Sequence, residues 1–139
     1  MLRYFWNHMR KRARGERGFT LIELVVVLAI LGILIALAVP RYLGARRRSY
    51  AAEARNILQE IKTLEWAYWQ QFNTFRGFTA DDPTLGWSTP TGARFAYSAV
   101  GADATDVTLI ASGNATETNG ISLQLVLNSN GSSTLTETF

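Results

Sequence analysis

The sequence predicts an α+β protein in which a long N-terminal helix packs on a C-terminal antiparallel β-meander of about four strands. Three observations in the 139 residues predict this fold class. A long apolar segment lies near the start, a stripe of apolar residues with helical spacing follows it, and four runs of alternating polarity occupy the C-terminal part. These patterns divide the chain into residues 1–18, 19–40, 41–76 and 77–139.

The first segment, residues 1–18, carries most of the positive charge. It contains six basic residues and one acidic residue, a net charge of +5, whereas the whole chain has a net charge of +3. Residues 77–139 contain one arginine and six acidic residues, a net charge of −5. Basic charge confined to one end indicates a terminal signal rather than a nucleic-acid-binding surface.

The composition excludes several classes of function. The chain has no cysteine, which excludes disulfide scaffolds, thiolate zinc sites, iron–sulfur clusters and thiol catalysis. His8 is the single histidine, and it lies in the basic segment at the start of the chain. A Ser–His–Asp triad is therefore not expected, and a metal site with several histidine ligands is excluded. We therefore expect neither an enzyme nor a cofactor.

The second segment, residues 19–40, is expected to form a transmembrane helix. From Phe19 to Val39 only Thr20 and Glu23 are polar, and a helix of this length spans about 31 Å, close to the hydrocarbon core of a bilayer. A simple membrane anchor is one interpretation. A secretory signal peptide is another, because the A-x-A pattern ending at Ala38 resembles a cleavage site. Neither explains Glu23, because a carboxylate inside such a segment costs about 2.5–3.5 kcal/mol.

Residues 17–23, Arg-Gly-Phe-Thr-Leu-Ile-Glu, followed by apolar residues up to Pro40, resemble the N-terminal signature of type IV pilins and pseudopilins. The resemblance covers about residues 14–45. It implies a structural subunit of a type IV pilus or pilus-like filament, in which residues 1–18 are a leader that a prepilin peptidase removes after Gly18. It also implies that Phe19 becomes the N-methylated first residue and that Glu23 is required for assembly.

Elementary electrostatics is consistent with that role of Glu23. Cleavage leaves a free α-amino group on Phe19, which is cationic at neutral pH. On a helix Phe19 and Glu23 are spaced i, i+4 and share one face. Two opposite charges in an apolar bundle satisfy each other, and pairing between neighbouring subunits would fix their axial stagger. The alternative is a protonated Glu23 with a water or backbone partner.

Gly32 and Pro40 weaken this helix. Proline in a helix interior costs about 3 kcal/mol, and glycine costs roughly 1 kcal/mol. In many assembled pili the helix melts in the corresponding region, so the resemblance implies a melted segment between Gly32 and Pro40. A gentle proline kink satisfies the same chemistry, and both possibilities stay open.

The third segment, residues 41–76, is expected to continue as an amphipathic helix. Its apolar residues recur at spacings of three and four, which places them on one face: Tyr50, Ala54, Ile57, Ile61, Leu64, Tyr68 and Phe72. The helix is expected to end near Asn73–Gly77.

The fourth segment, residues 77–139, is expected to form a globular head. Residues 78–93 are rich in turn residues and predict a loop. Four short runs follow, and they predict an antiparallel meander whose apolar face lies on the helical stripe. The runs are 95–99, 107–111, 121–127 and 132–139.

Two features of this region are weak candidates for ligand binding. Asp103 and Asp106 lie in one turn and could contact calcium, but two carboxylates are too few for a site of six to eight oxygens, so no metal is expected. Five aromatic residues cluster in the sequence, namely Trp66, Trp69, Phe75, Phe78 and Trp87. DNA stacking on them is conceivable but unsupported, because the nearby charge is not strongly basic, and core and subunit contacts are favoured.

The resemblance also implies partners and a location. The partners are further copies of the chain, other pilins, a prepilin peptidase and an inner-membrane assembly platform. The subunit would cross the inner membrane once, with a cytoplasmic N-terminus, before it enters an extracellular surface filament. This orientation depends on the cleavage motif, because six basic residues precede the apolar segment and five follow it. The alternatives are a minor pilin, a pseudopilin of a type II secretion system, or a membrane-anchored ligand-binding module that does not polymerise.

Overall fold

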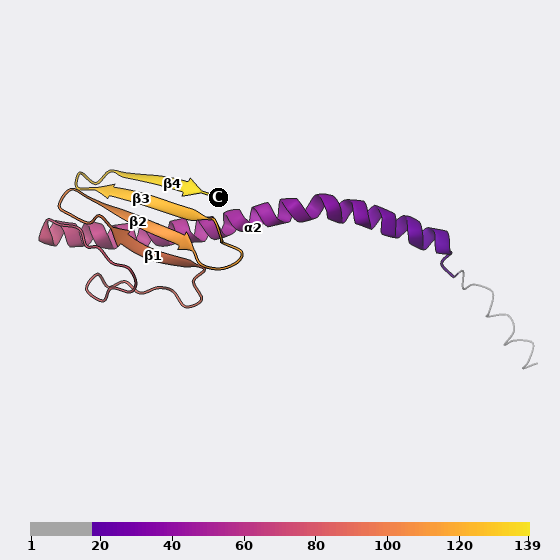
Figure 1. Ribbon diagram of the computed structural model, residues 1–139, viewed down its shortest axis with the longest axis horizontal. Coiled ribbons are helices and arrows are strands. Elements are labelled where there is room, and N and C mark those ends of the chain that lie inside the picture. Colours follow the sequence, from indigo (N-terminus) through magenta and orange to yellow (C-terminus); the bar gives the residue numbers. More distant parts are fainter. Residues whose placement is uncertain (1–17) are drawn as a thin grey trace, which may run out of the picture. The chain divides into compact units, whose positions relative to one another are not determined.

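The computed structural model describes residues 18–139, which form one long helix and four strands (Figure 1). In chain order these are α2 (Leu21–Phe72), β1 (Phe95–Val100), β2 (Asp106–Gly113), β3 (Ser122–Asn128) and β4 (Ser133–Thr138). The predicted α+β class is confirmed. Apart from Gly18, the predicted leader lies outside the described residues. The chain divides into two compact units, one ending at Arg41 and one running from Tyr42 to Phe139, and α2 contributes to both.

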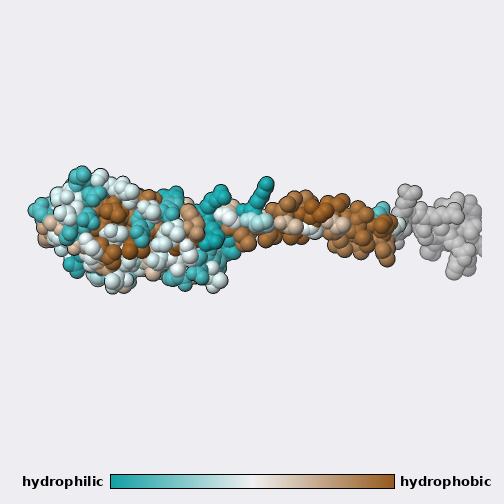
Figure 2. Space-filling model, turned by 45° about the horizontal axis from the view of Figure 1, so that its top comes forward, coloured by the Kyte–Doolittle hydropathy of each residue, from teal (hydrophilic) through white to brown (hydrophobic). Residues whose placement is uncertain are grey.

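The first unit presents an apolar helical surface that no residue between 18 and 139 covers. All its described side chains are exposed, including every large hydrophobic one from Phe19 to Val39. Figure 2 shows this segment of the helix as almost uniformly hydrophobic. Within residues 18–139, α2 is the one helix long and apolar enough to cross a membrane. This surface therefore needs lipid or another protein chain to remove it from water.

The second unit is built on an antiparallel meander. The strand order is β1-β2-β3-β4, and every neighbouring pair is antiparallel. In the first three strands every second side chain is buried, so one face of the sheet is apolar. The C-terminal half of α2 lies across the sheet (Figure 1), and the buried residues of helix and strands form one core. The four predicted strands are confirmed.

The buried face of α2 differs from the predicted stripe. The fully buried positions are Ala51, Ala54, Leu58, Ile61 and Glu65. Tyr50, Ile57, Leu64 and Tyr68 are only partly buried, and Phe72 is 53% exposed. The sheet covers the row that runs through Leu58 and Glu65, which includes a carboxylate that hydropathy alone assigns to the solvent side.

The helix ends one residue before the predicted range. Asn73 follows the last helical residue with a φ of 55°, and its N–H donates to the Trp69 carbonyl at 2.7 Å. A left-handed residue at this position is a common way for a helix to end, and asparagine tolerates that conformation better than most side chains.

The loop between α2 and β1 is folded onto the core. Phe78 pairs with Ala99 of β1, and Asp82 pairs with Trp87 across a tight turn. Of the aromatic cluster, Phe75, Phe78 and Trp87 are buried, and the rings of Trp66 and Trp69 stack with centroids 5.2 Å apart. The prediction that these residues belong mainly to the core is therefore confirmed.

A buried carboxyl group ties this loop to the helix. Glu65 has no exposed surface, and one of its oxygens accepts a hydrogen bond from the Arg76 N–H at 2.9 Å. Burial raises the pKa of Glu65 to about 7, with a further rise from Asp82 that the Arg76 hydrogen bond opposes. The Arg76 guanidinium in turn contacts Asp82 at 2.6 Å, so the loop is held by a short polar network.

Candidate assembly site

The apolar half of α2, residues 21–41, contains one acidic residue, Glu23. Glu23 lies in the first turn of the helix and is hydrogen-bonded to Thr20. Glu23 Oε2 accepts hydrogen bonds from the backbone N–H and the hydroxyl of Thr20, both at 2.8 Å. The Thr20 hydroxyl in turn accepts the N–H of Glu23 at 3.3 Å. This reciprocal arrangement is a capping box, which satisfies backbone donors that the first turn of a helix otherwise leaves open.

Sequence reasoning assigned no role to Thr20, although the pattern Thr-x-x-Glu before an apolar run is a recognised signal for a capping box. The structure adds it to the site as the residue that orients the Glu23 carboxylate. The second oxygen, Oε1, accepts no hydrogen bond from any residue between 18 and 139. One lone-pair-bearing oxygen of this carboxylate is therefore open to a partner outside the subunit.

The expected helical alignment of Phe19 with Glu23 is wrong. Helix α2 begins at Leu21, so Phe19 precedes the first turn. The reason is the cap itself, because the capping residue and its predecessor have non-helical backbone angles. Phe19 and Glu23 therefore do not share a helical face in this structure, and pairing of a Phe19 amine with Glu23 of a neighbouring chain stays a prediction.

No described residue crowds the predicted cleavage position. A Cβ atom added to Gly18 would meet nothing within 4 Å, and both Gly18 and Phe19 are exposed. The fold of the described residues thus makes no demand for glycine at position 18.

Gly32 and Pro40 lie within the helix in this single chain. The helical assignment of α2 runs through both, and a Cβ added to Gly32 would meet no atom within 4 Å. Gly32 therefore leaves a small gap on the helix surface where another chain could approach closely. Melting or kinking of this segment in a filament stays a prediction.

Asp103 and Asp106 are committed to the turn that precedes β2. One oxygen of Asp103 accepts hydrogen bonds from the N–H and hydroxyl of Thr105, both at 2.6 Å, and from the Asp106 N–H at 3.0 Å. These hydrogen bonds lower the pKa of Asp103. Among residues 18–139 no three acidic or histidine side chains come close enough to hold a metal ion. The geometry of this pair serves the turn.

Comparison with known proteins bears on the same N-terminal region. Residues 13–39 match the family described as the prokaryotic N-terminal methylation motif. The chain is 35% identical over 99 residues to the type IV wide pilus major component PilA4 of Thermus thermophilus, an alignment that covers 70% of this chain and 74% of that protein.

Two further relatives match over shorter stretches. The type IV major pilin PilA of Myxococcus xanthus is 34% identical over 82 residues, which are 59% of this chain and 36% of the relative. The type IV major fimbrial protein FimA of Dichelobacter nodosus is 49% identical over 47 residues, 34% of this chain and 29% of the relative. The chain thus aligns with only about a third of the length of these two relatives. Together with the three-quarter coverage of the Thermus protein, these similarities show that the chain belongs to the type IV pilin family.

Proposed function

We propose that this pilin is a non-enzymatic structural subunit of a surface filament, assembled through the apolar half of α2. The observation that carries the proposal is the contrast between a fully exposed apolar helix and a single capped carboxylate at its start. Neighbouring helices would bury the apolar surface, and the free oxygen of Glu23 would accept the amine of an incoming Phe19. A contact of this kind joins different surfaces of the two copies, so it generates a fibre rather than a closed ring.

Before assembly the same helix would hold the subunit in the inner membrane. The capping box supports this state, because Thr20 satisfies one oxygen of Glu23 within the subunit, which lowers the cost of placing that carboxylate at the edge of the bilayer. A prepilin peptidase would remove residues 1–18, methylate Phe19, and pass the subunit to an assembly platform.

The relatives named above are major pilus components, and this favours a major subunit over a minor pilin or a secretion pseudopilin.

The proposal is tested by shearing fibres from cells that express the chain and measuring the mass of the dominant protein. A polypeptide that begins at Phe19, heavier by one methyl group, is expected as the bulk component. A mature chain that begins at Val39 would instead establish a secretory signal and remove the basis for a filament.

A substitution at the cleavage site separates processing from folding. Because the side chain of residue 18 would meet no atom within 4 Å, Gly18→Leu should leave the fold of the chain unchanged. We expect the leader to stay attached and filaments to be absent, as seen by immunoblot and electron microscopy. Gly32→Leu, also at an open position, is the matched control and should be processed normally. Normal processing of Gly18→Leu would contradict the proposed cleavage.

A further inference from the structure

A basic cluster follows the apolar segment on the side that the proposed orientation places outside the cytoplasm. The cluster is Arg46, Arg47 and Arg48, and only five residues separate it from Pro40. Removal of residues 1–18 would take away six basic residues on the cytoplasmic side. The mature segment would then carry its basic flank on the non-cytoplasmic side, the reverse of the usual bias. Such an excess of positive charge at a membrane calls for an anion.

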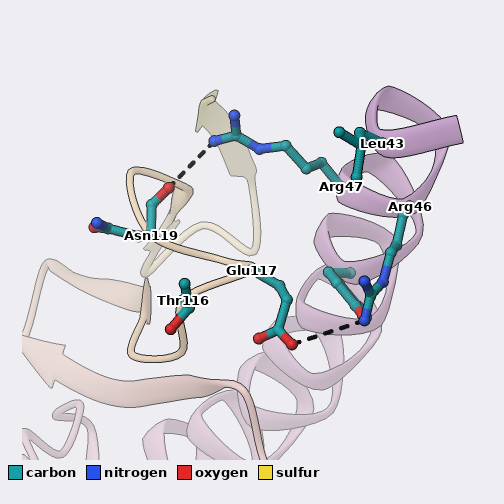
Figure 3. Close-up of a pocket in the computed structure, with 7 residues that line it drawn as sticks. Leu43, Arg46, Arg47, Thr116, Glu117 and Asn119 are labelled. Carbon is teal, nitrogen blue, oxygen red and sulfur yellow. Dashed lines mark hydrogen bonds and ion pairs between the residues drawn. The ribbon is translucent and has the colours of Figure 1, made fainter. Parts of the chain in front are cut away.

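The cluster lines two hollows on the surface of the second unit. The first, of about 400 Å³, lies between α2 and the loop that joins β2 to β3 (Figure 3). Its polar lining comes from Arg46, Arg47, Tyr50, Thr116, Glu117 and Asn119. The second, of about 320 Å³, is lined by Arg47 and Arg48 together with Gly44 and Phe139. Arg47 is common to both, and each volume suits a small ligand or headgroup.

The arginines are weakly neutralised by their own chain. Arg46 reaches Glu117 only at 3.7 Å, and both side chains are substantially exposed. Arg47 donates to the Asn119 carbonyl at 3.2 Å, a neutral partner. Within residues 18–139, Arg48 has no carboxylate within 4 Å. By contrast, Arg55 donates to Glu137 at 2.7 Å. Guanidinium groups left in this state retain donors for a phosphate.

The wall opposite the helix is held in place. The Thr118 side chain is fully buried and donates to the Arg94 carbonyl at 2.8 Å. Gly113 packs so closely against it that a Cβ there would lie 2.0 Å from the Thr118 carbonyl oxygen. A loop fixed in this way keeps the first hollow open without a ligand, which reduces the ordering cost of binding.

The surroundings of the cluster are apolar and exposed, which favours a lipid over a soluble anion. Tyr42 is 66% exposed and Phe139 is 58% exposed. Leu43, which follows Tyr42 in the sequence, is exposed as well. Arginine combined with tyrosine and aliphatic side chains is typical of residues at the membrane–water interface, where the ring and the alkyl stems contact acyl chains and the charged groups contact headgroups.

We propose that Arg46, Arg47 and Arg48 bind phosphates of anionic phospholipids in the non-cytoplasmic leaflet before the subunit leaves the membrane, through the two hollows that share Arg47. The inference rests on the membrane-inserted state of the proposed function, but not on filament formation. Glu117 competes with the phosphate for Arg46, so it weakens binding and lets the lipid be released when the subunit is extracted.

The test uses the chain from Phe19 to Phe139 in neutral detergent micelles, titrated with short-chain phosphatidylglycerol in a calorimeter. Short-chain phosphatidylcholine and glycerol phosphate are the comparison ligands. We expect saturable binding of phosphatidylglycerol that weakens with added salt, and markedly weaker binding of the other two. Replacing one arginine by glutamine should weaken binding about fivefold, since each basic residue near an anionic surface contributes about 1 kcal/mol.

Two matched variants sharpen the result. Arg55→Gln removes an equal charge that is already paired with Glu137, and it should leave lipid affinity unchanged. Glu117→Gln removes the competitor and should tighten binding, a gain that an unfolded variant could not produce. Equal affinity for phosphatidylglycerol and phosphatidylcholine, or for glycerol phosphate, would overturn the lipid assignment. So would an Arg46→Gln/Arg47→Gln double variant that binds lipid normally yet fails to form filaments, because the cluster would then be a contact between subunits.

Discussion

The two parts of α2 differ in how they satisfy their apolar surface. Up to Arg41 no described side chain is buried, whereas between Tyr42 and Phe72 five positions are buried against the sheet. The same helix thus has a C-terminal part whose apolar face packs on the sheet and an N-terminal part whose apolar surface is exposed. The second unit has its own core, whereas the apolar surface of the first needs a bilayer or other copies of the chain to remove it from water.

The largest expected effect concerns Glu23, the one acidic residue among the described residues of the uncovered part. Glu23→Gln keeps the capping box, because glutamine also accepts the Thr20 N–H, but it removes the negative charge. We expect normal insertion and cleavage with few or no filaments, counted by electron microscopy, because an incoming Phe19 amine then lacks its counter-ion. Glu23→Ala should behave similarly and increase membrane retention. Filaments of normal number and length from Glu23→Gln cells would exclude charge pairing and leave a protonated Glu23 as the alternative.

Two leucine substitutions, one in each part of α2, test this difference. Leu58 is fully buried and Leu31 is exposed. Leu58→Ala should lower the free energy of unfolding of the second unit by about 2–5 kcal/mol, because it leaves a cavity in the core. Leu31→Ala should change it by less than about 0.5 kcal/mol, while still weakening assembly. Chemical denaturation of the chain in detergent micelles, followed by tryptophan fluorescence, measures the free energy of unfolding of both variants. Counting filaments by electron microscopy measures their assembly. Equal losses would contradict the separation of the two surfaces.

A smaller effect should appear in the pH dependence of stability. The pKa of Glu65 is raised to about 7 in the folded chain from its ordinary value of 4.5, so the folded state binds more protons between these values. Its contribution to stability is therefore fully present below about pH 4.5 and is lost as the pH rises towards 7, by at most about 3 kcal/mol. Glu65→Gln, which keeps an acceptor for the Arg76 N–H, should remove this decline. An unchanged pH profile in that variant would show that another group titrates.

Sequence patterns predicted the second unit well because its elements follow simple periods. Alternation from Phe95 to Ala99 and from Ile121 to Leu127 indicated strands that the structure contains. The exact buried face of α2 was not predictable, because the burial of Glu65 depends on Arg76 from the loop, a contact that no local pattern encodes. Likewise, helical spacing suggested that Phe19 faces Glu23, whereas capping by Thr20 starts the helix two residues later.

The most direct test of the central claim measures which surface is covered in the filament. The chain contains no cysteine, so single cysteines can be placed at Val25, in the apolar part, and at Thr136, an exposed position of β4. Sheared, detergent-free filaments are treated with a soluble maleimide. We expect rapid labelling of Thr136→Cys, and labelling of Val25→Cys only after detergent has dissociated the filaments. Equally rapid labelling of both in intact filaments would contradict the central claim.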